Sequence, residues 1–472
     1  MTDEIKYASA IELAQMVRSR QISPVEVVRH ALDRLDETEP SLNAFVARND
    51  GASLAAAREA EQAIMRGDEV GPLLGVPVSI KDLIDVADMP CRYGSLTMAD
   101  NVPTEDAPSV DRLRAAGAII IGKTATSEFG LRGYTESLVH GVTRNAWDLS
   151  RTPGGSSGGA VTSVAAGVTP IALGTDGGGS IRAPCALTGI SGIKAQHGRV
   201  PIHPPSATPT LAHVGPIARS IADAALVLSV IAGSDLRDHT SLLPSLGCMA
   251  AGDRIDFSKL RIAFSPTLGY ATVDPEVAEI VDAAVKQLQS LFPNIDLVDS
   301  VCPDPGEILA TEFVAGCSAR LGNLIDTSPE RIDPVVVQAI EEFRNYPASR
   351  LANVQRERLE HRKRLFHFFQ SFDVLLTPTT PTVAWHIGPG IPPGFEDVPV
   401  WVFFTYPFNL TGQPAASVPC GYTDDGLPVG LQFIVRPLEE ELLVSVAGTA
   451  ETRLGAAGHR PPWPPQSNPA TG

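Results

Sequence analysis

RTPGGSSGGAVTSVAAGVTPIALGTDGGGSIR, the stretch from Arg151 to Arg182, contains two glycine clusters that each present serine. A run of mostly small or apolar side chains joins the two clusters. Because glycine lacks a Cβ atom, its backbone can approach a ligand closely and adopt conformations that other residues avoid. Two such clusters around hydroxyl groups indicate a site where backbone N–H groups and serine oxygens converge on one small group. Either cluster alone is also typical of an ordinary loop in a glycine-rich fold.

The bulk composition indicates a folded, acidic protein. The chain has 472 residues, of which 43% are hydrophobic and 19% charged, as in ordinary globular proteins. Length alone allows two to four domains, although large α/β enzymes often form one continuous body. The net charge of −17 opposes binding to nucleic acid or to an anionic membrane, both of which call for basic patches.

The cysteines and the N-terminus favour a cytoplasmic protein. The six cysteines lie far apart and form neither a C-x-x-C pair nor a metal-ligand spacing with histidine. They are Cys91, Cys185, Cys248, Cys302, Cys317 and Cys420. The first residues, MTDEIKY, lack a signal-peptide pattern, and no apolar stretch approaches the roughly 18 residues that span a bilayer. We therefore expect reduced thiols, a soluble chain, and neither a metal nor another cofactor.

Helices and strands alternate along the chain, which is typical of an α/β protein. The capping box Ser23-Pro24-Val25-Glu26 begins a helix expected to reach Asp36. Further helices are expected over residues 52–65, 109–116, 220–232, 274–291 and most of 306–370. Strands are expected over residues 42–46, 75–81, 118–121, 193–200 (with a turn), 260–264, 295–298 and 374–376. The strand–helix–strand order of 260–298 favours parallel pairing.

Three short motifs have rival interpretations. Gly117–Thr124 spells a phosphate-loop pattern, but its consecutive isoleucines favour a strand, whose N–H groups would be used in the sheet. Gly154–Gly158 fits the G-x-S-x-G elbow of α/β-hydrolases, although the segment before it is polar and a poor strand. Ser191–Lys194 fits S-x-x-K of penicillin-recognising enzymes without the motifs that accompany it there. A nucleotide-binding module and an α/β-hydrolase esterase therefore stay as remote alternatives.

The combination of motifs is more specific than its parts. Lys81 in VSIKD, Ser156 in PGGSSGG and Ser180 in GTDGGGSIR together resemble the amidase signature family, and the spacing of 24 positions between the two serines matches. The stretches GAIIIGKTATSEF, TRNAWD and FNLTGQPAASVPCG also fit, so the resemblance covers most of the chain. It implies an α/β fold with a large mixed, mostly parallel central sheet covered by helices on both faces.

The resemblance also implies a division of the chain and a set of catalytic roles. Residues 1–70 would be a helical segment packed on a single core of 71–455, with a largely helical insertion around 306–370 and a proline-rich tail over 456–472. Ser180 would be the nucleophile, Ser156 a bridging serine held in a cis peptide, and Lys81 the base. Backbone N–H groups of Gly177, Gly178, Gly179 and Ser180 would form the oxyanion hole. The supporting residues would be Ser157, Thr175, Asp176 and Arg182.

The proposed chemistry requires an unusual lysine. A serine hydroxyl becomes a strong nucleophile only when a neighbouring base takes its proton, and a lysine with its ordinary pKa of roughly 10.4 is protonated at neutral pH. Burial lowers that pKa by disfavouring the charged form. The apolar flanks of Lys81, from Val76 to Ile84, indicate such burial. Attack by Ser180 would give an acyl-enzyme that water hydrolyses, cleaving a carboxylic amide C–N bond.

The sequence leaves the substrate open. The family would allow aliphatic and aryl amides, carbamates and esters. Residues 395–408 hold six aromatic side chains in fourteen positions, which favours a hydrophobic or aryl substrate; core packing is the alternative. The expected pocket residues are Phe129, Tyr134, Trp401, Phe403 and Phe404. The chain departs from the family at two positions. Gly177 stands where the family usually has a larger residue, and this smaller residue could widen the pocket. Ala146 stands where the family usually has proline.

The main alternative within the family is the glutamine-hydrolysing subunit of a tRNA-dependent amidotransferase, which would work in an assembly. We otherwise expect a monomer or homodimer acting on a small molecule, without nucleic acid or membrane as partner.

Overall fold

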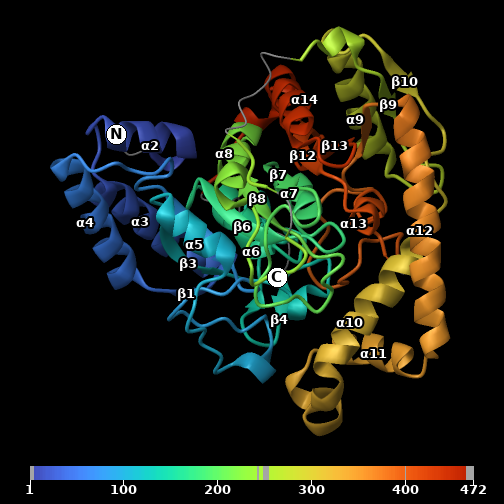
Figure 1. Ribbon diagram of the computed structural model, residues 1–472, viewed down its shortest axis with the longest axis horizontal. Helices are drawn as coiled ribbons and strands as arrows, with labels where there is room; N and C mark the ends of the chain where they lie inside the picture. The colour runs from blue at the N-terminus through green and yellow to red at the C-terminus, as the bar shows by residue number, and fades with distance from the viewer. Residues whose placement is uncertain (1–4, 242–243, 248–254, 399, 464–472) are drawn as a thin grey trace.

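The computed structural model describes residues 5–241, 244–247, 255–398 and 400–463. Within these ranges, eleven strands form one mixed sheet in the order β1-β3-β2-β6-β8-β7-β12-β13-β11-β9-β10, seen across the centre of Figure 1. Its strands are β1 (Phe45–Arg48), β2 (Pro77–Lys81), β3 (Ile119–Thr124), β6 (Ile171–Thr175), β7 (Ser191–Lys194), β8 (Val214–Ala218), β9 (Ile262–Phe264), β10 (Ile295–Leu297), β11 (Val374–Pro378), β12 (Ala415–Tyr422) and β13 (Pro428–Val435). A small hairpin of β4 (Glu136–Ser137) and β5 (Gly141–Val142) lies apart.

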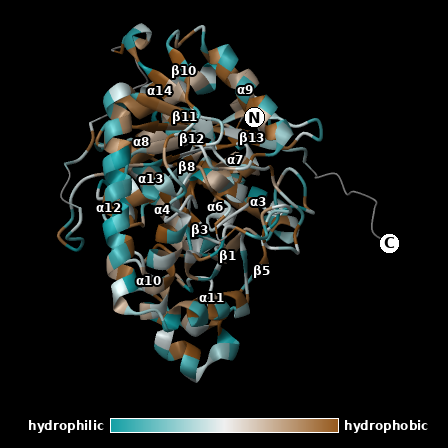
Figure 2. Ribbon diagram, turned by 90° about the vertical axis from the view of Figure 1, so that its right-hand side faces the viewer, coloured by the Kyte–Doolittle hydropathy of each residue, from teal (hydrophilic) through white to brown (hydrophobic). Residues whose placement is uncertain are grey.

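Helices cover both faces of this sheet (Figures 1 and 2). They are α2 (Ala10–Arg18), α3 (Pro24–Leu42), α4 (Asp50–Arg66), α5 (Pro108–Ala115), α6 (Gly158–Ala165), α7 (Arg182–Thr188), α8 (Ile221–Ile231), α9 (Pro275–Leu288), α10 (Gly306–Thr327), α11 (Pro334–Arg344), α12 (Ala348–Ser371), α13 (Pro407–Thr411) and α14 (Glu440–Leu454). The prediction of a large mixed sheet covered by helices on both faces is confirmed, but antiparallel neighbours outnumber parallel ones, so the sheet is not mostly parallel.

Parallel pairing is confined to two groups of the described strands. β2 pairs in parallel with both β3 and β6, and β9 pairs in parallel with both β10 and β11, while the other neighbours are antiparallel. The β9–α9–β10 unit has the parallel pairing that its sequence spacing predicts.

Alternating side chains of the strands divide the core between the two faces. Ile120 of β3 and Leu173 of β6 belong to the core under α8, α9 and α14. Ile121 of β3 and Ala172 of β6 belong to the opposite core, with α3 and α6. This is the period of two that a strand buried on both faces requires.

The N-terminal helix α3 is longer than its sequence pattern predicts. The capping box at Ser23 is present, but the helix continues past Asp36 and through Pro40 to Leu42. Asn43 ends it in the left-handed conformation, with φ of 49°, a usual way to stop a helix. Strand β1 consequently begins at Phe45 rather than at Leu42.

The segment that mimics a phosphate loop is strand β3. Its Lys123 is fully buried and donates to the Ile84 carbonyl at 2.6 Å, with Asp82 3.5 Å away. A Cβ atom on Gly122 would lie 2.5 Å from the Ala47 carbonyl oxygen of β1. The glycine therefore serves strand packing, and the lysine has no access to a nucleotide.

Helices α10, α11 and α12 form an arm beside the sheet, drawn yellow to orange in Figure 1. Helices α10 and α11 share a small core of their own, against which Phe129 packs. The helical character predicted for residues 306–370 is confirmed, and this arm supplies one wall of the site described below.

Two sequence predictions fall partly outside the described residues: the state of Cys248 and most of the proline-rich tail. The five described cysteines are free and buried. Among the described residues, no helix combines the length and apolar character needed to cross a membrane.

Candidate active site

Two neighbouring parallel strands place the first functional groups. Strand β2 ends at Lys81 and strand β6 ends at Thr175, with Ile80 opposite Leu173 in the register. The carboxyl ends of adjacent parallel strands are where α/β proteins commonly build sites. The loop before α6, which holds Ser156 and Ser157, comes to the same place.

Lys81 is fully buried, and its amine lies within hydrogen-bond distance of three hydroxyl groups. Its Nζ lies 2.7 Å from Ser156 Oγ, 2.9 Å from Ser157 Oγ and 2.8 Å from Thr175 Oγ1. Burial lowers the pKa of Lys81 well below its ordinary value, and the charge of Asp176 only partly opposes this. In its neutral form, which burial favours, a lysine has a free electron pair with which to accept a proton.

The Ser156 loop is held by close backbone packing. The peptide bond between Gly155 and Ser156 is cis, as the family resemblance implies. A Cβ atom on Gly155 would lie 2.7 Å from the backbone of Tyr134, and one on Gly158 would overlap the Thr135 hydroxyl. These contacts explain why the sequence around the serines is rich in glycine.

The second glycine cluster forms the turn between β6 and α7. Gly179 has a φ of +140°, and a Cβ atom there would overlap the hydroxyl of Thr405. That hydroxyl donates to the Gly178 carbonyl at 2.6 Å, which fixes the turn. Ser180 lies at its end, half-buried, and lines the same cavity as Ser156 and Thr175.

Phe313 fills the space beside Gly177. A Cβ atom on Gly177 would lie 2.9 Å from Cε2 of Phe313, which comes from α10. The smaller residue therefore does not simply widen the pocket, because a ring from the arm occupies the volume that a larger side chain would take.

A buried ion pair supports the turn from behind. Asp176 and Arg182 are both fully buried, with Arg182 Nη2 2.9 Å from Asp176 Oδ1. Burial by itself would raise the pKa of Asp176, but the Arg182 charge and hydrogen bonds from Arg182 and Asn409 hold it well below its usual range. Arg182 also donates to the Thr405 carbonyl and to Gln432 Oε1. The pair thereby ties the turn to α13 and β13.

Sequence reasoning did not single out Asn409, although it stands in the FNLTGQP stretch that supports the family resemblance. Its amide donates to both the carbonyl and the carboxylate of Asp176 at 3.0 and 2.9 Å. That stretch was the available signal for this residue.

A cavity of about 80 Å³ opens beside the two serines. Its walls come from the proline-rich loop after β7, from residues 212–214, from α10 and from the short turn Glu128–Gly130, which we call the Phe129 turn. They include Leu83, Tyr93, Phe129, Ile202, Pro204, Pro205, Ser206, Ala207, Thr208, His213, Phe313 and Arg320. Most of these residues carry no motif, so no pattern in the chain connects them with Ser156.

The structure places only one of the five expected pocket aromatics in this cavity. Phe129 lines it. Trp401, Phe403 and Phe404 are instead buried in the core next to α12 and α13, where Trp401 contacts Trp385 at 4.9 Å between ring centroids. Tyr134 packs against that core and accepts a hydrogen bond from Arg132. The aromatic enrichment of 395–408 is therefore explained by core packing.

The serines of the G-x-S-x-G and S-x-x-K matches have hydrogen-bond partners other than those that the two enzyme families require. The hydroxyls of Ser156 and Ser157 in the G-x-S-x-G match contact Lys81, and no histidine is hydrogen-bonded to either among the described residues. In the S-x-x-K match, Ser191 donates to Glu451 while Lys194 donates to the Gln413 carbonyl. Neither pattern has the arrangement its family requires.

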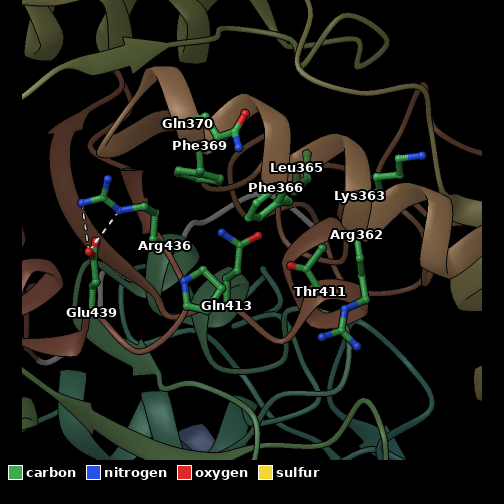
Figure 3. A pocket seen from close by; sticks show the side chains of 11 residues that line it. Arg362, Lys363, Leu365, Phe366, Phe369, Gln370, Thr411, Gln413, Arg436 and Glu439 are labelled. Atoms are coloured by element: carbon green, nitrogen blue, oxygen red, sulfur yellow. Dashed lines mark hydrogen bonds and ion pairs between the residues drawn. The ribbon is translucent and has the colours of Figure 1, made fainter.

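A larger cavity, of about 760 Å³, lies between α12 and the segments that follow α13 and β13. In Figure 3, Phe366 and Phe369 stand above Gln413, with the Arg436–Glu439 pair to one side. None of the expected catalytic residues lines it.

Comparison with known proteins identifies the family of this arrangement. A family model described as Amidase matches residues 26–444. An acylamidase of Rhodococcus erythropolis is 34% identical over 98% of both chains. A glutamyl-tRNA(Gln) amidotransferase subunit of Acidothermus cellulolyticus is 36% identical over 96% of this chain and 95% of its own.

The fold agrees with these sequence matches. The crystal structure of a bacterial aryl acylamidase of the amidase signature family superimposes with a TM-score of 0.86 at 27% identity. The match covers 97% of this chain and 99% of the other.

Proposed function

Since the chain belongs to the amidase signature family and is a hydrolase of carbon–nitrogen amide bonds, we propose that it works through an acyl-enzyme. Ser180 is the nucleophile, Ser156 the proton relay and Lys81 the base. The observation that carries the proposal is the fully buried Lys81, whose amine contacts three hydroxyl groups and whose pKa burial lowers. A buried amine with a lowered pKa and hydroxyl neighbours can accept a proton, whereas a lysine with a structural role is usually charged and paired with a carboxylate.

The reaction follows from the order of these groups. Ser180 attacks the amide carbonyl carbon as Ser156 accepts its proton and passes its own to Lys81. The backbone N–H groups of the Gly177–Ser180 turn stabilise the negative oxygen, a contribution of about 2.7–4 kcal/mol per donor in other hydrolases. Lys81 then returns a proton through Ser156 to the leaving nitrogen, the C–N bond breaks, and water hydrolyses the ester to Ser180.

The cavity supports amides with a small or narrow group beside the serines. Its volume of about 80 Å³ is well below the roughly 300–1,000 Å³ of drug-sized sites. The apolar side chains of Phe129, Ile202 and Phe313 line it, which favours an aliphatic or aryl group over a strongly polar one. Carbamates and esters offer the same carbonyl and are secondary substrates in this proposal.

Two variants test the assignment. We expect Ser180→Ala and Lys81→Met each to lower kcat on butyranilide by about 10⁴-fold or more, because nucleophile and base act as one unit. The matched control is Ser150→Ala, which removes a hydroxyl whose partners are Asp148 and His386. Near-wild-type turnover in either triad variant, with the fold intact by circular dichroism, would refute the mechanism.

A second candidate function is glutamine hydrolysis within a tRNA-dependent amidotransferase, which the 36% identity to a component of such an enzyme favours. The two candidate functions differ in whether the purified chain is active without partner proteins. If the purified chain alone hydrolyses anilides but not glutamine, it is a free-standing amidase. If it needs added partner proteins and prefers glutamine, the amidotransferase role is correct.

A further inference from the structure

Among the residues that the structure describes, Arg320 is the one charged side chain in the wall of the catalytic cavity. The lining residues are otherwise apolar, hydroxyl-bearing or glycine, apart from His213. Burial lowers the pKa of His213 well below its ordinary value, which favours the neutral imidazole. Arg320 comes from α10 and is exposed to solvent, which places its charge at the mouth rather than beside the serines.

Two aromatic rings hold the guanidinium in place. Its carbon lies 4.9 Å from the ring centroid of Tyr93 and 5.6 Å from that of Phe129. The two rings are stacked with centroids 6.1 Å apart, and the Tyr93 hydroxyl donates to Asp85 at 2.8 Å. Such cation–π contacts orient an arginine without satisfying its N–H groups.

The hydrogen-bonding capacity of Arg320 is largely unused. Its Nη1 makes a long hydrogen bond to the Pro205 carbonyl at 3.4 Å. Within the described ranges of the chain, no carboxylate lies within ion-pair distance of it. A guanidinium has five N–H donors in a planar fork, so most of them are available to a ligand in the cavity.

We infer that Arg320 binds a carboxylate carried by the substrate at the end remote from the scissile bond. The inference rests on the proposed amide hydrolysis and specifies its substrate class: an amide with an apolar portion and one terminal carboxylate. A planar fork matches a carboxylate in two parallel hydrogen bonds. A single guanidinium balances a monoanion, whereas a phosphate dianion calls for further cations, and the described wall offers no other.

The position of Arg320 matters because the chain as a whole repels anions. With a net charge of −17, the surface offers an anionic amide little general attraction. A local cation, held on two rings at the entrance, gives such a substrate a specific point of attachment.

Matched substrates test the inference. Butyranilide and succinanilic acid differ by a carboxylate on the acyl side, and butyranilide and 4-butyramidobenzoic acid differ by one on the amine side. We expect wild-type kcat/KM to be about 10- to 100-fold higher for the anionic member of at least one pair, the range of a charge-assisted hydrogen bond. Arg320→Met should reduce that ratio to about one, and Arg320→Lys should retain part of it. The pair that responds identifies the side that carries the carboxylate.

Lys286→Met is the control, because it removes the same charge from an exposed position on α9 and should leave the ratio unchanged. The inference is overturned if the wild type shows no preference in either pair, or if Arg320→Met keeps the wild-type ratio. If no anilide is hydrolysed, the proposed function fails. The inference about Arg320 can then still be tested, because calorimetry measures binding without turnover. Ser180→Ala should then bind succinanilic acid or 4-butyramidobenzoic acid at least about 10-fold more tightly than butyranilide, and equal binding would overturn it.

Discussion

At the scale of single residues, the proposed mechanism depends on the burial of Lys81. It is as deeply buried as Arg182, yet its neighbours are hydroxyls instead of a carboxylate in hydrogen-bond contact. Arg182 is paired with the carboxylate of Asp176, while burial lowers the pKa of Lys81 and so favours its neutral form. Two buried basic side chains thus have different tasks: Arg182 pairs with a carboxylate, and Lys81 accepts a proton in the proposed mechanism.

The pH profile should reveal this state. Because the pKa of Lys81 is lowered by burial, the base becomes neutral at a lower pH than a free lysine does. We expect kcat/KM on a neutral anilide to rise with pH through the lowered pKa and to level off well below the ordinary value of roughly 10.4. A rise that continues to about pH 10 would show that Lys81 is not the base, since the substrate itself does not titrate in this range.

Sequence motifs located Lys81, Ser156 and Ser180, because these residues sit in short segments that the backbone requires to be glycine-rich or β-branched. The cavity wall could not be located in the same way. Phe313 and Arg320 stand in an ordinary amphipathic helix, and only the path of α10 across the sheet brings them to Gly177. Local patterns therefore indicate the proposed reacting groups more readily than they indicate the residues of the cavity wall.

At the scale of elements, helix α11 of the arm is attached to the Phe129 turn by buried polar groups. The carboxylate of Glu128 accepts a hydrogen bond from the backbone N–H of Asp333 at 2.7 Å, at the start of α11. Asp333 in turn pairs with Arg132. Because α10 carries Phe313 and Arg320, this attachment positions one wall of the cavity.

Glu128 makes that attachment sensitive to pH. Burial raises its pKa to about 7, against roughly 4.3 in an unfolded chain. Between these values the folded state binds more protons, so the contribution of Glu128 to stability is greatest below about pH 4 and is lost as pH rises through about 7.

Glu128→Gln keeps an acceptor for the Asp333 N–H and removes the titrating charge. We expect its free energy of unfolding, relative to wild type, to increase by about 2–3 kcal/mol between about pH 5 and about pH 8.5, as measured by urea denaturation. Glu330→Gln, at an exposed position of the same arm, should show no such change. A constant difference between Glu128→Gln and wild type at both pH values would mean that Glu128 is ionised throughout.

At the scale of the whole molecule, the sheet joins segments from both ends of the chain. Leu35 of α3 lies in the core on one face, and Leu443 of α14 lies in the core on the other, both fully buried. Strand β1 pairs with β3 at one edge, so the N-terminal segment is part of the sheet as well as of its cover. We therefore propose that residues 1–70 fold together with the rest and not as a separate unit, a division that the sequence pattern alone could not decide.

Cooperative unfolding tests this proposal. Leu35→Ala and Leu443→Ala should each cost about 2–5 kcal/mol, the range for emptying a buried leucine site. If the chain is one cooperative body, both variants will shift the same single transition, seen alike by far-ultraviolet circular dichroism and by loss of amidase activity. Met65→Ala, at a position 66% exposed on α4, should change stability by less than about 0.5 kcal/mol. Leu35→Ala could instead show two transitions, the first of which lowers the helical signal while activity is retained. That result would show that the N-terminal helices unfold independently of the rest of the chain.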